Sequence, residues 1–130
     1  MEYSNVGSPM QQGDIDSPVK IRLLVDSFYI RVRKNEQLAP IFEQFIENWE
    51  THLPTMYQFW ERLLFGSEGY SGSPLERHVV LPIEKQHFNT WIQIFNHTVN
   101  DNFAGQKAEE AKRRARNIAT VFQLQMGMEP

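Results

Sequence analysis

The chain has 130 residues and no cysteine, with 41% hydrophobic residues, 22% charged residues and a formal net charge of −3 at pH 7. This length favours one domain, and the missing cysteines exclude a disulfide framework and thiolate metal sites. The slight acidity argues against nucleic acid or a membrane as a partner. The sequence shows neither a signal peptide nor a transmembrane segment, so we expect a cytoplasmic protein.

The first half of the chain predicts a tail followed by helices. Residues 1–16 are polar and turn-rich, which is typical of a flexible tail, and we place the folded domain at residues 17–130. Ser17 and Pro18 form a helix start, and apolar residues at helical spacing continue to about Lys34. Pro40 interrupts the pattern, so short helical turns are expected to carry the next apolar residues into the core, namely Ile41, Phe42, Phe45 and Ile46.

The rest of the chain predicts three more helices. A long helix capped by Asn48 should run to about Phe65, and the glycine-rich stretch that follows is a loop. Pro82 is expected to begin the next helix, and a last helical face follows Gly105. No alternating strand pattern persists, so the chain is expected to be all-α with four principal helices.

Histidine and tyrosine positions are the main candidates for chemistry. His78 lies in "PLERHVVLP", where prolines restrict the backbone on both sides, although a turn histidine bonded to the backbone is the ordinary interpretation. His52 lies on the apolar face of the long helix, four residues before Met56, which also fits a boundary histidine. Tyr29 lies on the core face of the first helix, where its hydroxyl needs a hydrogen-bond partner. His87 and His97 are interpreted as surface residues.

Several familiar chemistries lack their motifs. Zinc needs three or four converging ligands, and the sequence has no H-E-x-x-H and no pair of Glu-x-x-His motifs for a di-iron site. It also has no G-x-S-x-G, P-loop or G-x-G-x-x-G motif. Nine Phe, four Tyr and three Trp are many rings for a small protein, so either the core is bulky or the rings surround something flat.

Three segments taken in order closely resemble the truncated haemoglobins of the third group. They are "LVDSFYIRVRKNEQLAPIFEQFI", "WETHLPTMYQFWERLLFGSEGYSGSPLERHVVLP" and "HFNTWIQIFNHT", and the resemblance extends over about residues 20–125. It implies a shortened globin fold, a 2-on-2 antiparallel helical sandwich around haem. The glycine-rich loop then stands where other globins have most of a proximal helix.

The resemblance also assigns residues to the two sides of the haem. It implies that His78 of "PL-x-x-H" is the iron ligand and that Tyr29, His52 and Trp91 form the distal, ligand-binding side. Phe42 of "PIF" is implied to pack against the porphyrin. We expect further pocket residues at Met56, Phe59, Trp60, Tyr70, Arg77 and Phe88, with Arg77, Tyr70 and His87 as candidates to meet the haem propionates.

The function implied is that of a b-type haem protein that binds iron protoporphyrin IX without a covalent link. Such a protein reversibly binds oxygen, carbon monoxide and nitric oxide, and would serve in oxygen binding or transport. The alternative is a haem enzyme for nitric oxide dioxygenation or peroxide chemistry at the same iron, with an unidentified reductase as partner. A helical interaction module without a cofactor would leave Tyr29 and the many rings unexplained.

Overall fold

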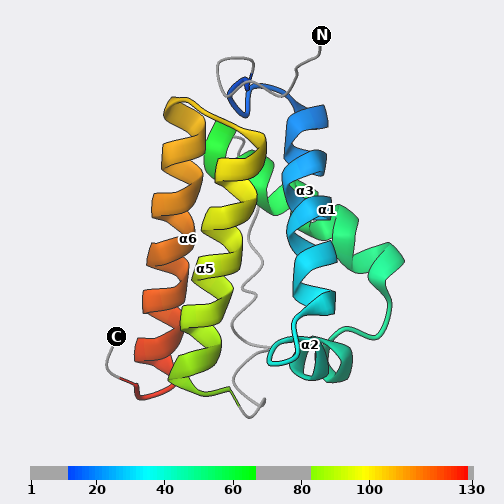
Figure 1. Ribbon diagram of the computed structural model, residues 1–130, viewed down its shortest axis with the longest axis vertical. Helices are drawn as coiled ribbons and strands as arrows, with labels where there is room; N and C mark the ends of the chain where they lie inside the picture. The colour runs from blue at the N-terminus through cyan, green and yellow to red at the C-terminus, as the bar shows by residue number, and fades with distance from the viewer. Residues whose placement is uncertain (1–11, 67–82, 129–130) are drawn as a thin grey trace, which may run out of the picture.

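The computed structural model describes residues 12–66 and 83–128, and all regular structure in these ranges is helical. This confirms the predicted all-α class. The elements follow one another as α1 (Pro18–Lys34), α2 (Ala39–Phe45), α3 (Trp49–Phe65), α5 (Lys85–Asn102) and α6 (Gln106–Gln125) (Figure 1).

Local signals in the sequence explain where α1 and α3 begin and end. The backbone N–H of Lys20 donates to Oγ of Ser17 at 3.4 Å, and Pro18 occupies the first turn of α1. The backbone N–H of Glu50 donates to the side-chain oxygen of Asn48 at 2.9 Å, which caps α3. Gly66 ends α3 with φ of 70°, a left-handed conformation that suits glycine. These predicted boundaries are confirmed.

Two predictions about the shorter elements need correction. Residues of α2 were expected in the core, but Phe42 and Phe45 are only half-buried and only Ile46, just after the helix, is buried. The reason is that α2 lies across one end of the bundle and presents its rings to a cavity. Pro82 was expected to start the next helix and lies outside the described residues, whereas α5 begins at Lys85.

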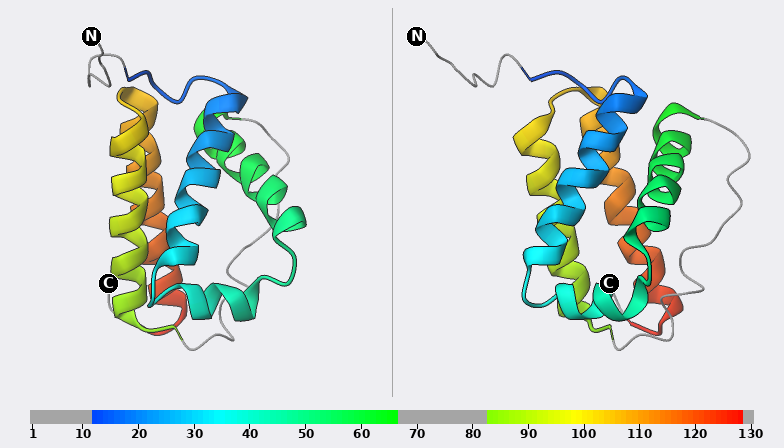
Figure 2. Two further views of the ribbon diagram at one scale, coloured as in Figure 1. Left: turned by 45° about the vertical axis from the view of Figure 1, so that its right-hand side comes forward. Right: turned by 90° about the vertical axis from the view of Figure 1, so that its right-hand side faces the viewer.

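The four long helices form two antiparallel pairs. One pair is α1 with α3, and the other is α5 with α6. α1 also packs against α5, and α3 against α6, so the two pairs cover each other (Figure 2). The buried faces meet in one core, to which α6 contributes alanines that allow close approach of α5. This arrangement confirms the 2-on-2 helical sandwich. α2 lies at the end where α5 begins and α6 ends (Figure 1).

The segment before α1 contacts the start of α6. The side chain of Ile15 is fully buried, and the carboxylate of Asp14 accepts from the backbone N–H groups of Lys107 at 2.9 Å and Ala108 at 2.8 Å. α6 begins after Gly105, which has no side chain to cap it, so Asp14 supplies the missing acceptor. Of the expected tail, residues 1–11 lie outside the described part, and the boundary at residue 16 stays a prediction.

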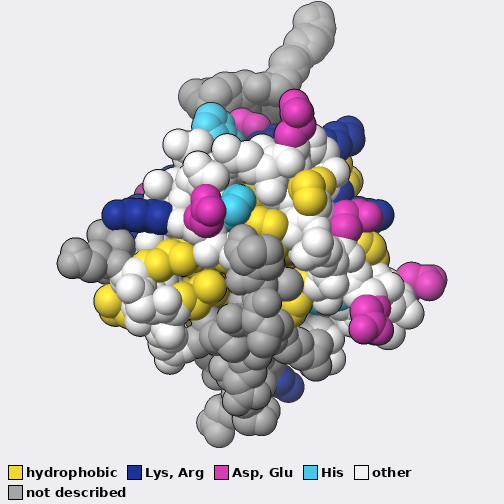
Figure 3. Space-filling model, turned by 90° about the horizontal axis from the view of Figure 1, so that it is seen from below, with side chains coloured by type: hydrophobic (Ala, Val, Ile, Leu, Met, Phe, Trp, Pro, Cys, Tyr) yellow, Lys and Arg dark blue, Asp and Glu magenta, His cyan; other side chains and the backbone are white. Residues whose placement is uncertain are grey.

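In the described ranges, no helix combines the length and apolar character needed to cross a bilayer. Hydrophobic side chains are nevertheless visible among polar ones at the end of the molecule that carries α2 (Figure 3).

Candidate functional site

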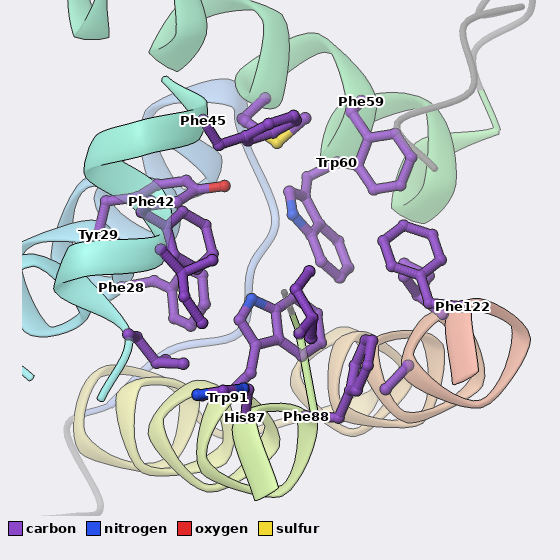
Figure 4. Close-up of a pocket in the computed structure, with 16 residues that line it drawn as sticks. Phe28, Tyr29, Phe42, Phe45, Phe59, Trp60, His87, Phe88, Trp91 and Phe122 are labelled. Carbon is purple, nitrogen blue, oxygen red and sulfur yellow. The ribbon is translucent and has the colours of Figure 1, made fainter. Parts of the chain in front are cut away.

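A cavity lies among the five described helices, in the half of the bundle closed by α2 (Figure 4). Sixteen residues line it, and nine of them are Phe, Tyr or Trp. The structure brings together seven residues that the sequence pointed to: Tyr29, Phe42, Met56, Phe59, Trp60, Phe88 and Trp91. The surplus of rings noted in the sequence is therefore concentrated around a hollow.

Sequence reasoning missed part of the lining. The additional residues are Phe28, Leu38, Ile41, Phe45, Ile83, Ile118, Ala119 and Phe122. Phe28 and Phe122 lie on faces that the helical spacing correctly predicts as apolar, but spacing does not tell which part of a buried face borders a cavity. His87, interpreted as a surface residue and as a candidate for the rim, also lies at this cavity.

Three stacked rings support the wall of the cavity. Phe95 stacks on Trp60 with ring centroids 5.0 Å apart, and on Trp91 with centroids 5.9 Å apart. Phe28 meets both Trp91 and Phe95 edge to face. Since Phe95 is itself buried, it holds the two indoles from behind and fixes the direction in which they face the cavity.

Tyr29 and His52 form the polar contact beside the cavity. The hydroxyl of Tyr29 lies 3.2 Å from Nε2 of His52, so helices α1 and α3 together position the pair. Tyr29 is buried among rings, and this burial raises the pKa of its hydroxyl above the ordinary value for tyrosine. At neutral pH the group is therefore a neutral hydroxyl that can donate a hydrogen bond.

His52 is enclosed on its other side by Trp49. The two rings meet edge to face with centroids 5.7 Å apart, and Trp49 meets Tyr29 in the same way at 5.3 Å. The guanidinium of Arg33 lies 4.5 Å from the centre of the Trp49 ring, a cation–π distance. His52 is not among the residues that line the cavity, so it acts on the cavity through Tyr29.

The remaining predicted site residues have no structural description. His78, Tyr70 and Arg77 lie outside the described residues, and their roles stay predictions. The described wall nevertheless fits a haem chemically. A porphyrin is a flat apolar disc, and the lining supplies flat apolar rings. Among the lining side chains, those that can donate a hydrogen bond are Tyr29, His87 and the two tryptophans.

Comparisons with known proteins agree with this geometry. A model of the family described as bacterial-like globin matches residues 14–127. The group 3 truncated haemoglobin of Campylobacter jejuni is 33% identical over 108 residues, which are 79% of this chain and 85% of that protein. The crystal structure of a group III truncated haemoglobin from Campylobacter jejuni matches with a TM-score of 0.81 and 29% identity, covering 89% of this chain and 95% of the other.

Proposed function

The chain belongs to the bacterial-like globin family, as a group III truncated haemoglobin, and we propose that it reversibly binds oxygen at a haem iron. Membership of the globins implies haem binding. The finer proposal is a non-covalent haem b, with carbon monoxide and nitric oxide as further ligands. The observation that carries it is the contact between the Tyr29 hydroxyl and His52 Nε2 beside a cavity of apolar rings.

Haem, when bound, supplies the iron that holds a diatomic ligand, and the chain supplies the surroundings. The buried Tyr29 hydroxyl is neutral at physiological pH because its pKa is raised, so it can donate a hydrogen bond. Such a donor would favour oxygen over carbon monoxide as the ligand, because oxygen would be the better hydrogen-bond acceptor of the two. The apolar rings around the hydroxyl exclude water and so strengthen that hydrogen bond.

The tautomer of His52 determines the direction in which the hydroxyl proton of Tyr29 points. If Nε2 carries hydrogen, it donates to the oxygen of Tyr29, and the tyrosine proton is free to point into the cavity. If Nε2 is bare, it accepts from Tyr29, and that proton points away from the cavity. Oxygen binding is therefore served by the tautomer in which His52 donates.

On the other face of the haem we propose His78 as the iron ligand, on the strength of the "PL-x-x-H" motif alone. To hold the iron, His78 would have to be neutral at the nitrogen that binds it, and its second nitrogen would need a hydrogen-bond acceptor. In the sequence, Pro74 precedes and Pro82 follows this histidine by four residues, and a proline ring limits the φ angle of its own residue.

Absorption spectra of the recombinant protein with haem test this proposal. We expect an intense near-ultraviolet band that shifts when carbon monoxide is added to the reduced protein. His78→Ala should abolish or strongly weaken tight haem binding, whereas His97→Ala, at an exposed position on α5, should leave the spectrum unchanged. A colourless protein that ignores added haemin would overturn the proposal, and an unchanged spectrum in His78→Ala would reject that ligand.

The same donors would also suit a haem enzyme for nitric oxide dioxygenation or peroxide chemistry, because hydrogen bonds at the distal side assist O–O cleavage. Rates separate the two functions. Ready release of oxygen without turnover supports binding or delivery. Very slow release of oxygen, together with rapid consumption of nitric oxide in the presence of a reductant, supports the enzyme and implies a reductase partner.

A further inference from the structure

His87 stands at the edge of the cavity with one of its ring nitrogens already engaged. The backbone N–H of Glu84 donates to Nδ1 of His87 at 2.8 Å, and the backbone N–H of His87 donates to the carbonyl of Glu84 at 2.9 Å. Because Nδ1 accepts a hydrogen bond, it carries no proton, and the neutral ring holds its hydrogen on Nε2. The start of α5 therefore selects one tautomer of this histidine.

The surroundings of His87 offer few hydrogen-bond acceptors to its Nε2–H group. His87 is half-buried beside Trp91, and no residue in the described ranges accepts a hydrogen bond from Nε2 (Figure 4). The neighbouring cavity wall is apolar, and a donor at such a border lowers its free energy by meeting an acceptor. An anionic acceptor would suit it better than a neutral one.

The position of His87 is also held at a fixed distance from α2. One turn further along α5, the hydroxyl of Thr90 donates to Oε1 of Gln37 at 2.6 Å, and Gln37 lies in the turn that leads into α2. This bond ties the two elements together where the cavity reaches the edge of the bundle. A ligand in the cavity would thus meet Nε2 at its border and not at its centre.

We propose that His87 binds a haem propionate through its Nε2–H. The inference rests on the proposed function, because it takes haem as the occupant of the cavity. A haem is an apolar disc that carries two carboxylates at one edge, so a single donor at the border of apolar walls matches that edge. His87 also fixes how the haem is rotated within its own plane, because one propionate has to lie within hydrogen-bond distance of Nε2.

The test compares haem loss from wild type, His87→Asn and His97→Ala, each loaded with haemin or with its propionate dimethyl ester. Asn keeps a side-chain oxygen near the place of Nδ1, so the cap of α5 survives while the Nε2–H is lost. Haemin transfer to an excess of another apo-globin gives the rate of loss. His97→Ala is the matched control, at an exposed histidine on the same helix.

We expect His87→Asn to release haemin on the order of ten-fold faster than wild type. The dimethyl ester should be released at nearly equal rates from both, since it has lost the charge that His87 meets, and His97→Ala should match wild type throughout. Equal haemin rates, or an equal acceleration for acid and ester, would overturn this inference. If wild type takes up no haemin, the proposed function fails as well, so the two failures are distinguishable.

Discussion

Phe95 stacks on Trp60, with ring centroids 5.0 Å apart and planes inclined by 20°. Phe95 is 1% exposed and does not line the cavity, whereas Trp60 does. The pair therefore joins the tightest part of the core to the wall of the candidate site. A change at Phe95 should be felt both as lost stability and as a disturbed cavity.

Phe95→Ala should lower the free energy of unfolding by about 3–5 kcal/mol, because it removes a buried ring and leaves a hole between two indoles. Phe95→Leu should cost less, since it keeps most of the apolar volume. Urea unfolding followed by tryptophan fluorescence measures both. A loss below about 1 kcal/mol for the alanine variant would mean that the indoles close the gap without Phe95.

Tyr29→Phe should speed the dissociation of oxygen by roughly ten- to a hundred-fold, because it removes a buried donor worth about 1.5–3 kcal/mol to a charged acceptor. Dissociation of carbon monoxide should change much less. Stopped-flow ligand replacement gives both rates. Tyr57→Phe is the matched control, since it makes the same change at a tyrosine that does not line the cavity. Equal oxygen rates in wild type and Tyr29→Phe would remove Tyr29 from the distal side.

Gly105→Ala should destabilise the fold far more than Gly66→Ala, although both glycines have positive φ. At Gly105, where φ is 142°, an added Cβ would lie 2.5 Å from Cγ of Asp14. At Gly66, where φ is 70°, the added atom meets none of the described residues within 4 Å. We expect a cost of about 1 kcal/mol at Gly66 and at least about 2 kcal/mol at Gly105. Thermal unfolding would contradict this reasoning if the two variants melted together.

Asp14 should stabilise the protein at neutral pH and lose this effect in acid. Burial acts to raise the pKa of Asp14, but hydrogen bonds from the backbone N–H groups of Lys107, Ile15 and Ala108 outweigh it and hold the pKa below its ordinary value. A depressed pKa means that the folded state favours the carboxylate. The contribution is therefore present above the unfolded-state pKa and disappears as pH falls through the folded-state pKa.

Asp14→Ala should cost about 1–2 kcal/mol at pH 7, the range for loss of a helix cap, and clearly less at pH 3. Urea unfolding at the two pH values measures the difference. Asp16→Ala serves as the control, because Asp16 is exposed and its nearest cation, Nζ of Lys20, is 3.6 Å away on the surface. A gap between wild type and Asp14→Ala that stays constant from pH 7 to pH 3 would contradict the assignment.

Tyr57 should lose its hydroxyl proton at a higher pH than an ordinary tyrosine, because this hydroxyl donates a hydrogen bond to a carboxylate. Burial, together with the hydrogen bond of 2.5 Å that Tyr57 donates to Asp26, raises its pKa to about 12. Asp26→Asn should lower this pKa without restoring the ordinary value, since burial remains. The rise in ultraviolet absorbance on ionisation follows the titration, with Tyr57→Phe identifying the signal. An unchanged midpoint in Asp26→Asn would show that the carboxylate has no influence.

Periodicity in the sequence was enough to predict the helices. Ser17 and Asn48 mark starts, Gly66 marks an end, and apolar spacing marks which faces are buried, because these are local effects of capping and of the helical repeat. Resemblance to a family was needed to pair Tyr29 with His52. The two residues are 23 positions apart on different helices, and no local rule brings them together.

Other features depend on packing between distant elements and were not predictable. Phe45 and Phe122 border the cavity only because α2 and the end of α6 come to the same end of the bundle. The charged segment around Asp14 is polar in composition, and nothing near it in sequence indicates that it would meet α6. His87 was already a candidate for the haem propionates from the sequence, but the bond from the backbone N–H of Glu84 that fixes its tautomer could not be predicted.

The cap on α6 links segments that are made at very different times. Asp14 precedes α1, the first helix of the described part of the chain, yet its carboxylate oxygens accept from backbone groups 93 and 94 residues later. During synthesis Asp14 is made before α1, and its partners in α6 are made only when most of the domain has been produced. Such a contact closes one of the longest loops available to the chain, which carries a large entropic cost and places it late in folding. We therefore expect two segments to become ordered together and to lose order together. They are the residues around Asp14 and the first turn of α6.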